Sequence, residues 1–357
     1  MKLAFLVADA TAQQPRWATI RLALAALTRG HEVLLVSIGD LTLAPGGSVV
    51  GEAVRPAAKV KDADALADSL RHAPRASIDL IAMDAIFLRY HPGREGPAAG
   101  QRMSPGLDFG MRLEAAGVLV VNAPEGAHAA GGRMYVSTLP ADVRPRSLIT
   151  RSPEKIKQFL RELDAPAVVK PLTEVHGPGD TEQVFYVARN QVKNLNQIIA
   201  VVRESGYAVV QEYLPDAEAG EQRLLLVDGE PLAVGERVAI YRRTHPGLAD
   251  APAHLKRRFG KRSRPATFDA GAQRIVERIG PRLRADGLFF VACDVVGDRV
   301  LGVNVHTPGG LHTASDLYQV DFASAVIDRL ERRAADHRMY RDATRRMTRD
   351  SGRLRTP

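Results

Sequence analysis

The stretch that decides the fold runs from residue 291 to residue 308 and reads VACDVVGDRVLGVNVHTP. Two short apolar runs flank Gly297-Asp298-Arg299, and a Gly-Asp turn between such runs predicts a β-hairpin. Side chains alternate between the faces of a strand, so positions 302 and 304 point the same way. Asn304 therefore adds a polar group to an apolar strand near Asp294, whereas Gly302 contributes no side chain.

Asp294 and Asn304 carry the oxygen atoms that a hard cation prefers. In phosphoryl-transfer sites Mg²⁺ is held by one or two carboxylates together with the phosphates of the substrate. One Asp and one Asn meet that need only in part. The alternative is structural, with both side chains hydrogen-bonded to the backbone of the turn, and the hairpin alone leaves both interpretations open.

Length and composition describe an ordinary globular protein of several domains. At 357 residues the chain is long for one core, and its 45% hydrophobic and 25% charged residues are typical values. The single cysteine, Cys293, excludes an internal disulfide framework and fits a reducing compartment. The start lacks the apolar run of a signal peptide, and no stretch reaches the ~20 residues that span a bilayer. We expect a cytoplasmic protein with no membrane partner.

The formal net charge of +8 is concentrated rather than spread. Residues 329–357 contain ten Arg and four acidic residues, and a second basic run covers 256–264. Few large apolar side chains follow Leu330, so 331–357 is predicted to be a frayed helix followed by disorder. Because only Phe259 and Tyr340 could stack on bases, we expect no nucleic-acid partner. Nucleic-acid binding through the tail stays as an alternative that predicts strong salt dependence.

The first 122 residues predict a Rossmann-like domain with a parallel sheet. A strand at 2–8, a helix at 17–27 and a strand at 31–36 form a βαβ opening. The further elements expected are a hairpin at 40–60, an edge strand at 78–88, a helix at 107–116 and a strand at 118–121. The loop after the first strand, residues 8–11, has no glycine, so a dinucleotide site is not expected.

The middle of the chain predicts a second unit that binds an anion. Ser152 and Pro153 begin a helix that runs to about residue 163, and a short apolar strand follows at 167–172. Lys170 lies in that strand, and a buried lysine is costly unless an anion meets it. Further strands are expected at 209–215 and 223–231.

Five motifs in one order give the chain a family resemblance. They are VVKPL at 168–172, VQEYLP at 210–215, GEQRLLLVDGEP at 220–231, DVVGDR at 294–299 and NVHTP at 304–308. This succession resembles the bacterial glutathione synthetases of the ATP-grasp superfamily over roughly residues 1–330. The resemblance implies an α/β protein in which two α+β subdomains of the ATP-grasp fold follow the N-terminal domain. The implied division is 1–122, then 123–208 and 209–330 for the two subdomains, then the tail 331–357.

The resemblance also implies an ATP- and Mg²⁺-dependent carboxylate–amine ligase that works through an acyl phosphate. The expected substrate is a small molecule, a peptide or amino acid carboxylate. Arg133 and Lys170 would contact the ATP phosphates, and Gln211, Glu212, Tyr213 and Leu214 would surround the adenine. Arg223 would act with Lys170 in catalysis, Arg89 and Arg243 would bind substrate, and Asp294 and Asn304 would hold Mg²⁺. The structural alternatives are a Lys170 that only extends to solvent and an Arg223 that pairs with Asp228 or Glu230.

The chain departs from the family pattern at three places. Gly302 stands where the family has a glutamate that bridges two magnesium ions. The loop at 173–182 is acidic where the family has a glycine-rich loop, and the segment 242–252 lacks the family's asparagine and paired glycines. These departures keep a second hypothesis open: a catalytically impaired ATP-grasp protein that binds a nucleotide or small ligand in a regulatory or scaffolding role. A homo-oligomer is also left open.

Overall fold

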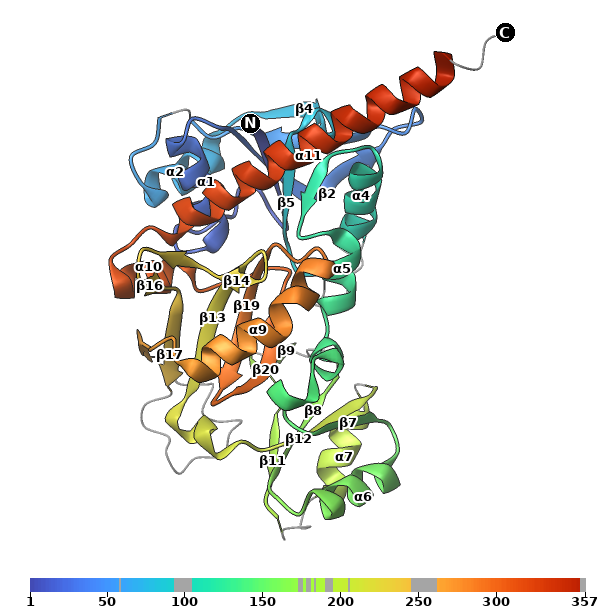
Figure 1. Cartoon of the computed structure of the whole chain (residues 1–357), viewed down its shortest axis with the longest axis vertical. Helices are drawn as coiled ribbons and strands as arrows, with labels where there is room; N and C mark the ends of the chain where they lie inside the picture. Colours follow the sequence, from blue (N-terminus) through green and yellow to red (C-terminus); the bar gives the residue numbers. More distant parts are fainter. Residues whose placement is uncertain are drawn as a thin grey trace.

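The computed structural model shows three α/β units that follow one another along the long axis of the molecule (Figure 1). It describes residues 1–57, 59–92, 105–172, 176–177, 181–182, 184–189, 195–204, 206–244 and 262–353. The N-terminal unit lies at one end, a small unit made by the middle of the chain lies at the other, and the sheet of the C-terminal half lies between them (Figure 1).

The N-terminal unit is a six-stranded sheet with the order β4-β3-β2-β1-β5-β6. Its parallel strands are β2 (Glu32–Leu43), β1 (Lys2–Val7), β5 (Ala85–Arg89) and β6 (Leu119–Val121), and the antiparallel edge is β3 (Val49–Val54) and β4 (Arg75–Asp79). Its helices are α1 (Ala18–Thr28), α2 (Ala63–His72) and α4 (Pro105–Ala115). The βαβ opening and the hairpin at 40–60 are therefore confirmed.

The predicted single edge strand at 78–88 is wrong. Strand β4 ends at Asp79, whose carboxylate accepts a hydrogen bond from the Ile81 N–H at 3.0 Å and starts a 3-10 turn, η1 (Leu80–Ala82). Strand β5 then begins at Ala85 and lies between β1 and β6, buried along its whole length. An apolar run of this length thus contains an edge strand and a central strand, because one Asp side chain breaks the extended backbone between them.

The small unit holds a four-stranded antiparallel sheet with the order β11-β8-β12-β7. Its elements are β7 (Ser147–Thr150), α6 (Pro153–Leu163), β8 (Ala167–Pro171), β11 (Phe185–Val187), α7 (Leu195–Glu204) and β12 (Ala208–Glu212), beside a short pair β9 (His176–Gly177) and β10 (Thr181–Glu182). Ser152 caps α6 as predicted, accepting from the Lys155 N–H at 3.3 Å. The expected boundary between the two subdomains, at 208/209, falls inside β12. Because β12 pairs with both β7 and β8, the sheet of the small unit extends to Glu212.

The sheet of the C-terminal half has the order β18-β17-β13-β19-β20, with β14 paired to β13. Its strands are β13 (Glu221–Val227), β14 (Glu230–Pro231), β17 (Ile240–Thr244), β18 (Arg262–Pro265), β19 (Phe290–Val296) and β20 (Arg299–Asn304), beside a short pair β15 (Ala233–Val234) and β16 (Arg237–Val238). Helices α9 (Ala270–Ala285) and α10 (Leu311–Tyr318) accompany it. The hairpin at 291–308 is confirmed, with a register shift after Asp294.

One asparagine joins the N-terminal domain to the C-terminal sheet. Asn122 follows β6 and is 1% exposed. Its amide nitrogen donates to the carbonyls of Phe290 at 2.9 Å and Val305 at 2.7 Å, and its Oδ1 accepts from the Phe290 N–H at 2.7 Å. These three bonds satisfy both donors and the oxygen of a buried polar side chain, which lies two residues before helix α5 (Pro124–Ala130).

The C-terminal helix α11 (Phe322–Arg353) returns to the N-terminal domain, crosses it and extends past it (Figure 1). Phe322, Ile327 and Leu330 are fully buried in a core that also contains residues of β1 and α1. The tail was predicted to be a frayed helix followed by disorder; the helix is found and continues further than expected, to Arg353, with Ala334 only 1% exposed. In the part of the chain that the structure describes, no helix is both long and apolar enough to cross a membrane.

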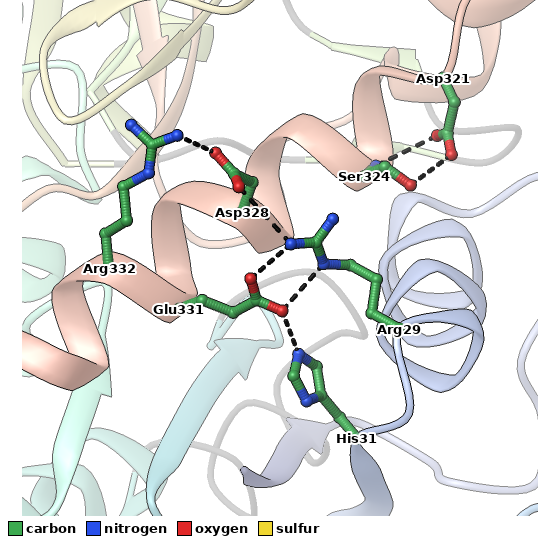
Figure 2. Close-up of polar contacts among 7 residues, drawn as sticks. All are labelled: Arg29, His31, Asp321, Ser324, Asp328, Glu331 and Arg332. Atoms are coloured by element: carbon green, nitrogen blue, oxygen red, sulfur yellow. Dashed lines mark hydrogen bonds and ion pairs between the residues drawn. The ribbon is translucent and has the colours of Figure 1, made fainter.

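Charged side chains hold α11 against the start of the chain (Figure 2). The Glu331 carboxylate accepts from Arg29 Nε at 2.8 Å and contacts His31 Nε2 at 2.5 Å. One turn earlier, Asp328 lies 3.5 Å from Arg29 and accepts from Arg332 at 2.7 Å. The hydrogen bonds from Arg29 lower the pKa of Glu331 to about 2, although partial burial opposes the shift.

Glu331→Gln is expected to lower the free energy of unfolding by about 1 kcal/mol at pH 7, because a network with Arg29 and His31 loses its anion. The folded-state pKa lies below the ordinary 4.5, so this stabilisation is present above pH 4.5 and lost as the pH falls towards 2. Urea denaturation at pH 7 and pH 3 measures both effects. Asp342→Asn is the control, since Asp342 is 58% exposed and its ion pair with Arg341 is long, at 3.9 Å. An equal effect of both variants would contradict the prediction.

Candidate active site

Two basic side chains meet at the end of strand β8. Lys170 is half-buried, and its Nζ donates to Gln211 Oε1 on the neighbouring strand β12 at 3.0 Å. Arg133, from the segment after α5, donates to the carbonyl of Pro171, the next residue of β8. The structure therefore brings together the two residues that the resemblance implies as phosphate ligands. Lys170 is also held by a hydrogen bond rather than simply extended into solvent.

The segment implied for adenine binding connects the sheet of the small unit to the sheet of the C-terminal half. Gln211 is 6% exposed, and the backbone N–H groups of Glu212 and Tyr213 donate to the carbonyls of Arg146 and Pro166, both at 2.9 Å. These bonds tie the segment to the small sheet. A base would therefore have to use its carbonyls or side chains rather than these two donors.

Beyond this segment, Leu214 begins a 3-10 turn, η4 (Pro215–Ala219), that leads into β13. The Tyr213 ring meets the Tyr186 ring edge to face, with centroids 5.1 Å apart. Burial, together with the charge of Glu218, raises the pKa of Tyr213, so its hydroxyl stays protonated at neutral pH. Adenine binding here stays a prediction.

An ion-pair cluster occupies one face of the C-terminal sheet. Arg223 on β13 forms a two-bond fork to Asp294 on β19, with Nε to Oδ1 and Nη2 to Oδ2 both at 2.9 Å. Arg243 on β17 donates to the same Oδ1 at 2.5 Å. The alternative in which Arg223 pairs with Asp228 or Glu230 is not found. Those two acids pair instead with Arg333 and Arg329 of α11.

The cluster is mostly shielded from water. The side chains of Arg223, Arg243 and Asp294 are 15%, 9% and 23% exposed. Burial alone would raise the pKa of Asp294, but the charges of Arg223 and Arg243 outweigh it and hold that pKa well below its usual range. Burial would also lower the pKa of Arg223, yet the Asp294 charge more than offsets it. Arg223 and Asp294 are therefore both charged at neutral pH.

Glu221 is the member of the cluster that the sequence did not identify. Its carboxylate lies 2.7 Å from Arg243 Nη2. A signal was available, because Glu221 stands two positions before Arg223 and alternation puts both on one face of β13. What the sequence lacked was the pairing of β13 with β17, which places Arg243 opposite Glu221.

The two remaining hairpin positions face the same side as Asp294. Gly302 is the direct cross-strand partner of Asp294, and a Cβ built on it meets no atom within 4 Å. Asn304 lies two residues on, where its Oδ1 accepts from the Thr307 N–H at 3.2 Å and its amide nitrogen contacts the Thr307 carbonyl at 3.4 Å. Asn304 is thus hydrogen-bonded to the backbone, as the structural alternative for the hairpin expects.

Arg89, at the end of β5, is a buried cation without a carboxylate partner among the described residues. It is 5% exposed, and its Nη2 donates to the Pro308 carbonyl at 3.1 Å. Its guanidinium lies 5.8 Å from the ring centroids of Phe87 and Phe290. Burial lowers the pKa of Arg89 to about 9, so it remains charged at pH 7. Its Nη1 is buried with no hydrogen-bond acceptor, which points to an anion as the missing partner.

The loop after β20 brings Arg89 towards the ion-pair cluster. Pro308 accepts from Arg89, and a Cβ on the next residue, Gly309, would lie 3.8 Å from Arg223 Nη1. Gly310 has a φ of +104°, and a Cβ there would overlap the Tyr241 hydroxyl at 2.3 Å. Glycine is required at 310 by both conformation and space. Residues of two domains, Arg89 and Arg223, therefore flank one short loop.

Two departures from the family pattern fall mostly on residues outside the description. The acidic loop at 173–182 is described only at 176–177 and 181–182, and the segment 245–261 is not described at all. Arg242 and Arg243, which open the second of these segments, both lie in β17, and only Arg243 belongs to the ion-pair cluster.

The N-terminal α/β domain is followed by two α+β units, and basic side chains lie on the sheets of both. These features are those of an ATP-grasp ligase. The family model for the prokaryotic glutathione synthetase ATP-grasp domain matches residues 132–319, and that for the N-terminal domain matches residues 1–127. The chain belongs to the prokaryotic glutathione synthetase family. It is an ATP-dependent ligase by class, as the resemblance implied, and the expected fold is confirmed.

Relatives agree with this family assignment, and solved structures agree with the fold. The chain is 31% identical to a glutathione synthetase of Synechococcus elongatus, over 93% of this chain and 98% of that protein. It is 32% identical to one of Agrobacterium fabrum, over 72% and 74%. A macrocyclase MdnC bound with precursor peptide MdnA from Microcystis aeruginosa shares the fold, with a TM-score of 0.60, 16% identity and coverage of 92% and 99%. A RimK domain ATP-grasp protein from Sphaerobacter thermophilus gives 0.54 at 21% identity, covering 92% and 98%.

The family implies ATP and a divalent metal, and the side chains present do not complete a site for two metal ions. Asp294 is engaged by two guanidinium groups, Asn304 is bonded to the backbone of Thr307, and Gly302 offers no donor. Across the described ranges, no group of three or more His, Cys, Asp or Glu side chains could hold a metal ion. Among the described residues, the two carboxylates of this cluster, Asp294 and Glu221, are both already paired with arginines.

Proposed function

We propose that this chain joins a carboxylate to an amine at the expense of ATP, through an acyl phosphate. The observation that carries the proposal is the position of Arg133. Its guanidinium bonds to β8 beside Lys170, while the residues just after it, η2 (Tyr135–Thr138), pack on β20 of the other sheet. The candidate phosphate ligands therefore adjoin the hairpin that carries Asp294.

The roles of the residues follow from their charges. Lys170 and Arg133 bind the phosphates of ATP, and the segment from Gln211 to Leu214 binds the adenine. The substrate carboxylate attacks the γ-phosphate, which gives an acyl phosphate and ADP. The amine then attacks the acyl carbon, phosphate leaves with the bonding electrons, and the amine loses a proton. Fixed cations such as Arg223 favour these steps because negative charge collects on the transferred group.

The proposed substrate is a peptide or amino acid carboxylate that enters from the N-terminal domain. Arg89 supplies a charged group there, one nitrogen of which, Nη1, has no acceptor among the described residues. Relatives are glutathione synthetases by name, and structural neighbours include an ATP-grasp ligase, PsnB, complexed with a minimal precursor. These names favour a ligase over the alternative of a nucleotide-binding protein without turnover. Magnesium is proposed to enter with the phosphates of ATP.

ATP is expected to raise the thermal stability of the chain, and Lys170→Ala is expected to abolish the effect. A nucleotide at 100 times its dissociation constant contributes about 2.7 kcal/mol to stability, which is readily measured as a shift in melting temperature. Lys155→Ala is the matched control, since Lys155 lies in the same domain and is exposed on α6. If ATP gave no shift with or without Mg²⁺, or the same shift in both variants, the proposed nucleotide site would be wrong.

A further inference from the structure

We infer that this chain binds its nucleotide with a single divalent ion, and that Arg223 and Arg243 supply the positive charge of a second one. The inference rests on the proposed function, since it concerns how the same nucleotide is neutralised. Its starting point is the disagreement between the two-ion site that the family implies and the side chains found around Asp294.

The charges around Asp294 do not favour binding of a free cation. Arg223 and Arg243 carry two positive charges, and Asp294 and Glu221 carry two negative ones, so the cluster is neutral. A cation site of the usual kind needs an excess of carboxylate. Lys170 and Arg133 add further positive charge on the neighbouring sheet. Together these four cations and two carboxylates are net positive, which favours a polyanion over an isolated metal ion.

The geometry of Asp294 leads to the same conclusion. A carboxylate offers about four lone-pair positions, and three of them already accept hydrogen bonds from Arg223 and Arg243. One position remains, which is enough to contact an ion held mainly by phosphate oxygens. A second ion would need a carboxylate of its own.

Residue 302 is where that carboxylate is missing. Gly302 lies directly across the hairpin from Asp294, and the space beyond its Cα is open. Its φ is not in the left-handed region, and a Cβ there meets no atom within 4 Å, so a side chain can start at 302 without backbone strain. A glutamate at 302 would make the cluster net negative and place a second anion beside Asp294. The number of bound ions should therefore depend on this one position.

The test counts Mn²⁺ ions by electron paramagnetic resonance, with a non-hydrolysable ATP analogue present at saturation. We expect one bound Mn²⁺ per chain in the wild type, two in Gly302→Glu and one in Gly302→Ala, which adds a methyl group without a charge. Gly302→Asp serves as a second acidic variant if Gly302→Glu folds poorly. Nucleotide binding is measured separately in each sample by equilibrium dialysis.

Two bound ions in the wild type would overturn the inference and leave the proposed function intact. One ion in both the wild type and the acidic variants would overturn the assignment of the missing ligand to residue 302. A wild type that binds no nucleotide would overturn the proposed function, and the inference with it.

The role given to the arginines has its own readout. Arg243→Met is expected to weaken binding of the analogue about tenfold, because the nucleotide loses one charge-assisted contact. Arg242→Met is the control, since Arg242 is the next residue of β17 and points to the other face of the sheet. Equal affinity in the two variants would show that the cluster does not neutralise the nucleotide.

Discussion

Asp294→Ala is expected to lower the free energy of unfolding by about 3 to 5 kcal/mol, the largest stability effect anticipated for a single change in this chain. The carboxylate is the shared acceptor of Arg223 and Arg243, whose side chains are 15% and 9% exposed. Without it, two mostly buried guanidinium groups lose their common partner, and among the described carboxylates Glu221 remains close to one of them.

Urea denaturation of the full chain measures this effect. Asp298→Ala is a suitable control, because Asp298 is 44% exposed in the turn of the same hairpin and contacts arginines at the surface. The control should lose less than about 1 kcal/mol. If Asp294→Ala also lowered the free energy of unfolding by less than about 1 kcal/mol, the cluster would contribute little to stability.

Arg223→Lys is expected to reduce ligation by roughly a hundredfold, the largest effect on activity anticipated here. Lysine keeps the charge but cannot form the two-bond fork to Asp294, so the cation shifts relative to the transferred phosphate. ADP release with a panel of peptides and amino acids measures the rate. Nucleotide affinity should change far less than the rate if Arg223 acts mainly on the transition state.

Arg329→Lys provides the comparison. Arg329 is a half-exposed arginine of α11 that pairs with Glu230 of β14, away from the cluster. Its activity should match that of the wild type. If Arg223→Lys kept full activity, the catalytic role of Arg223 would be refuted, and the fork would be a structural contact.

Local signals in the sequence predicted the secondary structure well. The Gly-Asp turn and the alternation around it predicted the hairpin at 291–308, and Ser152 followed by Pro153 predicted the start of α6. The error at 78–88 also has a local cause. Apolar content was continuous there, and the hydrogen bond of one Asp side chain to the backbone decided where β4 stops.

The candidate site was predictable by residue type but not by partner. Arg223, Asp294 and Lys170 were identified from motifs, yet Arg243 and Glu221 join the cluster only through the pairing of β13 with β17. That pairing is set by tertiary packing, which no short stretch of sequence contains. The ordered tail was missed for a similar reason, because Glu331 finds its partners Arg29 and His31 some 300 positions away.

The contact between α11 and the start of the chain has a consequence for synthesis. The core around β1 and α1 includes Phe322, Ile327 and Leu330, so the domain made first is completed by residues that lie some 300 positions after those two elements. Until α11 emerges from the ribosome, the apolar surface that it covers has no partner within the chain. The newly made N-terminal domain is therefore exposed to aggregation for most of translation, and its protection depends on the last helix.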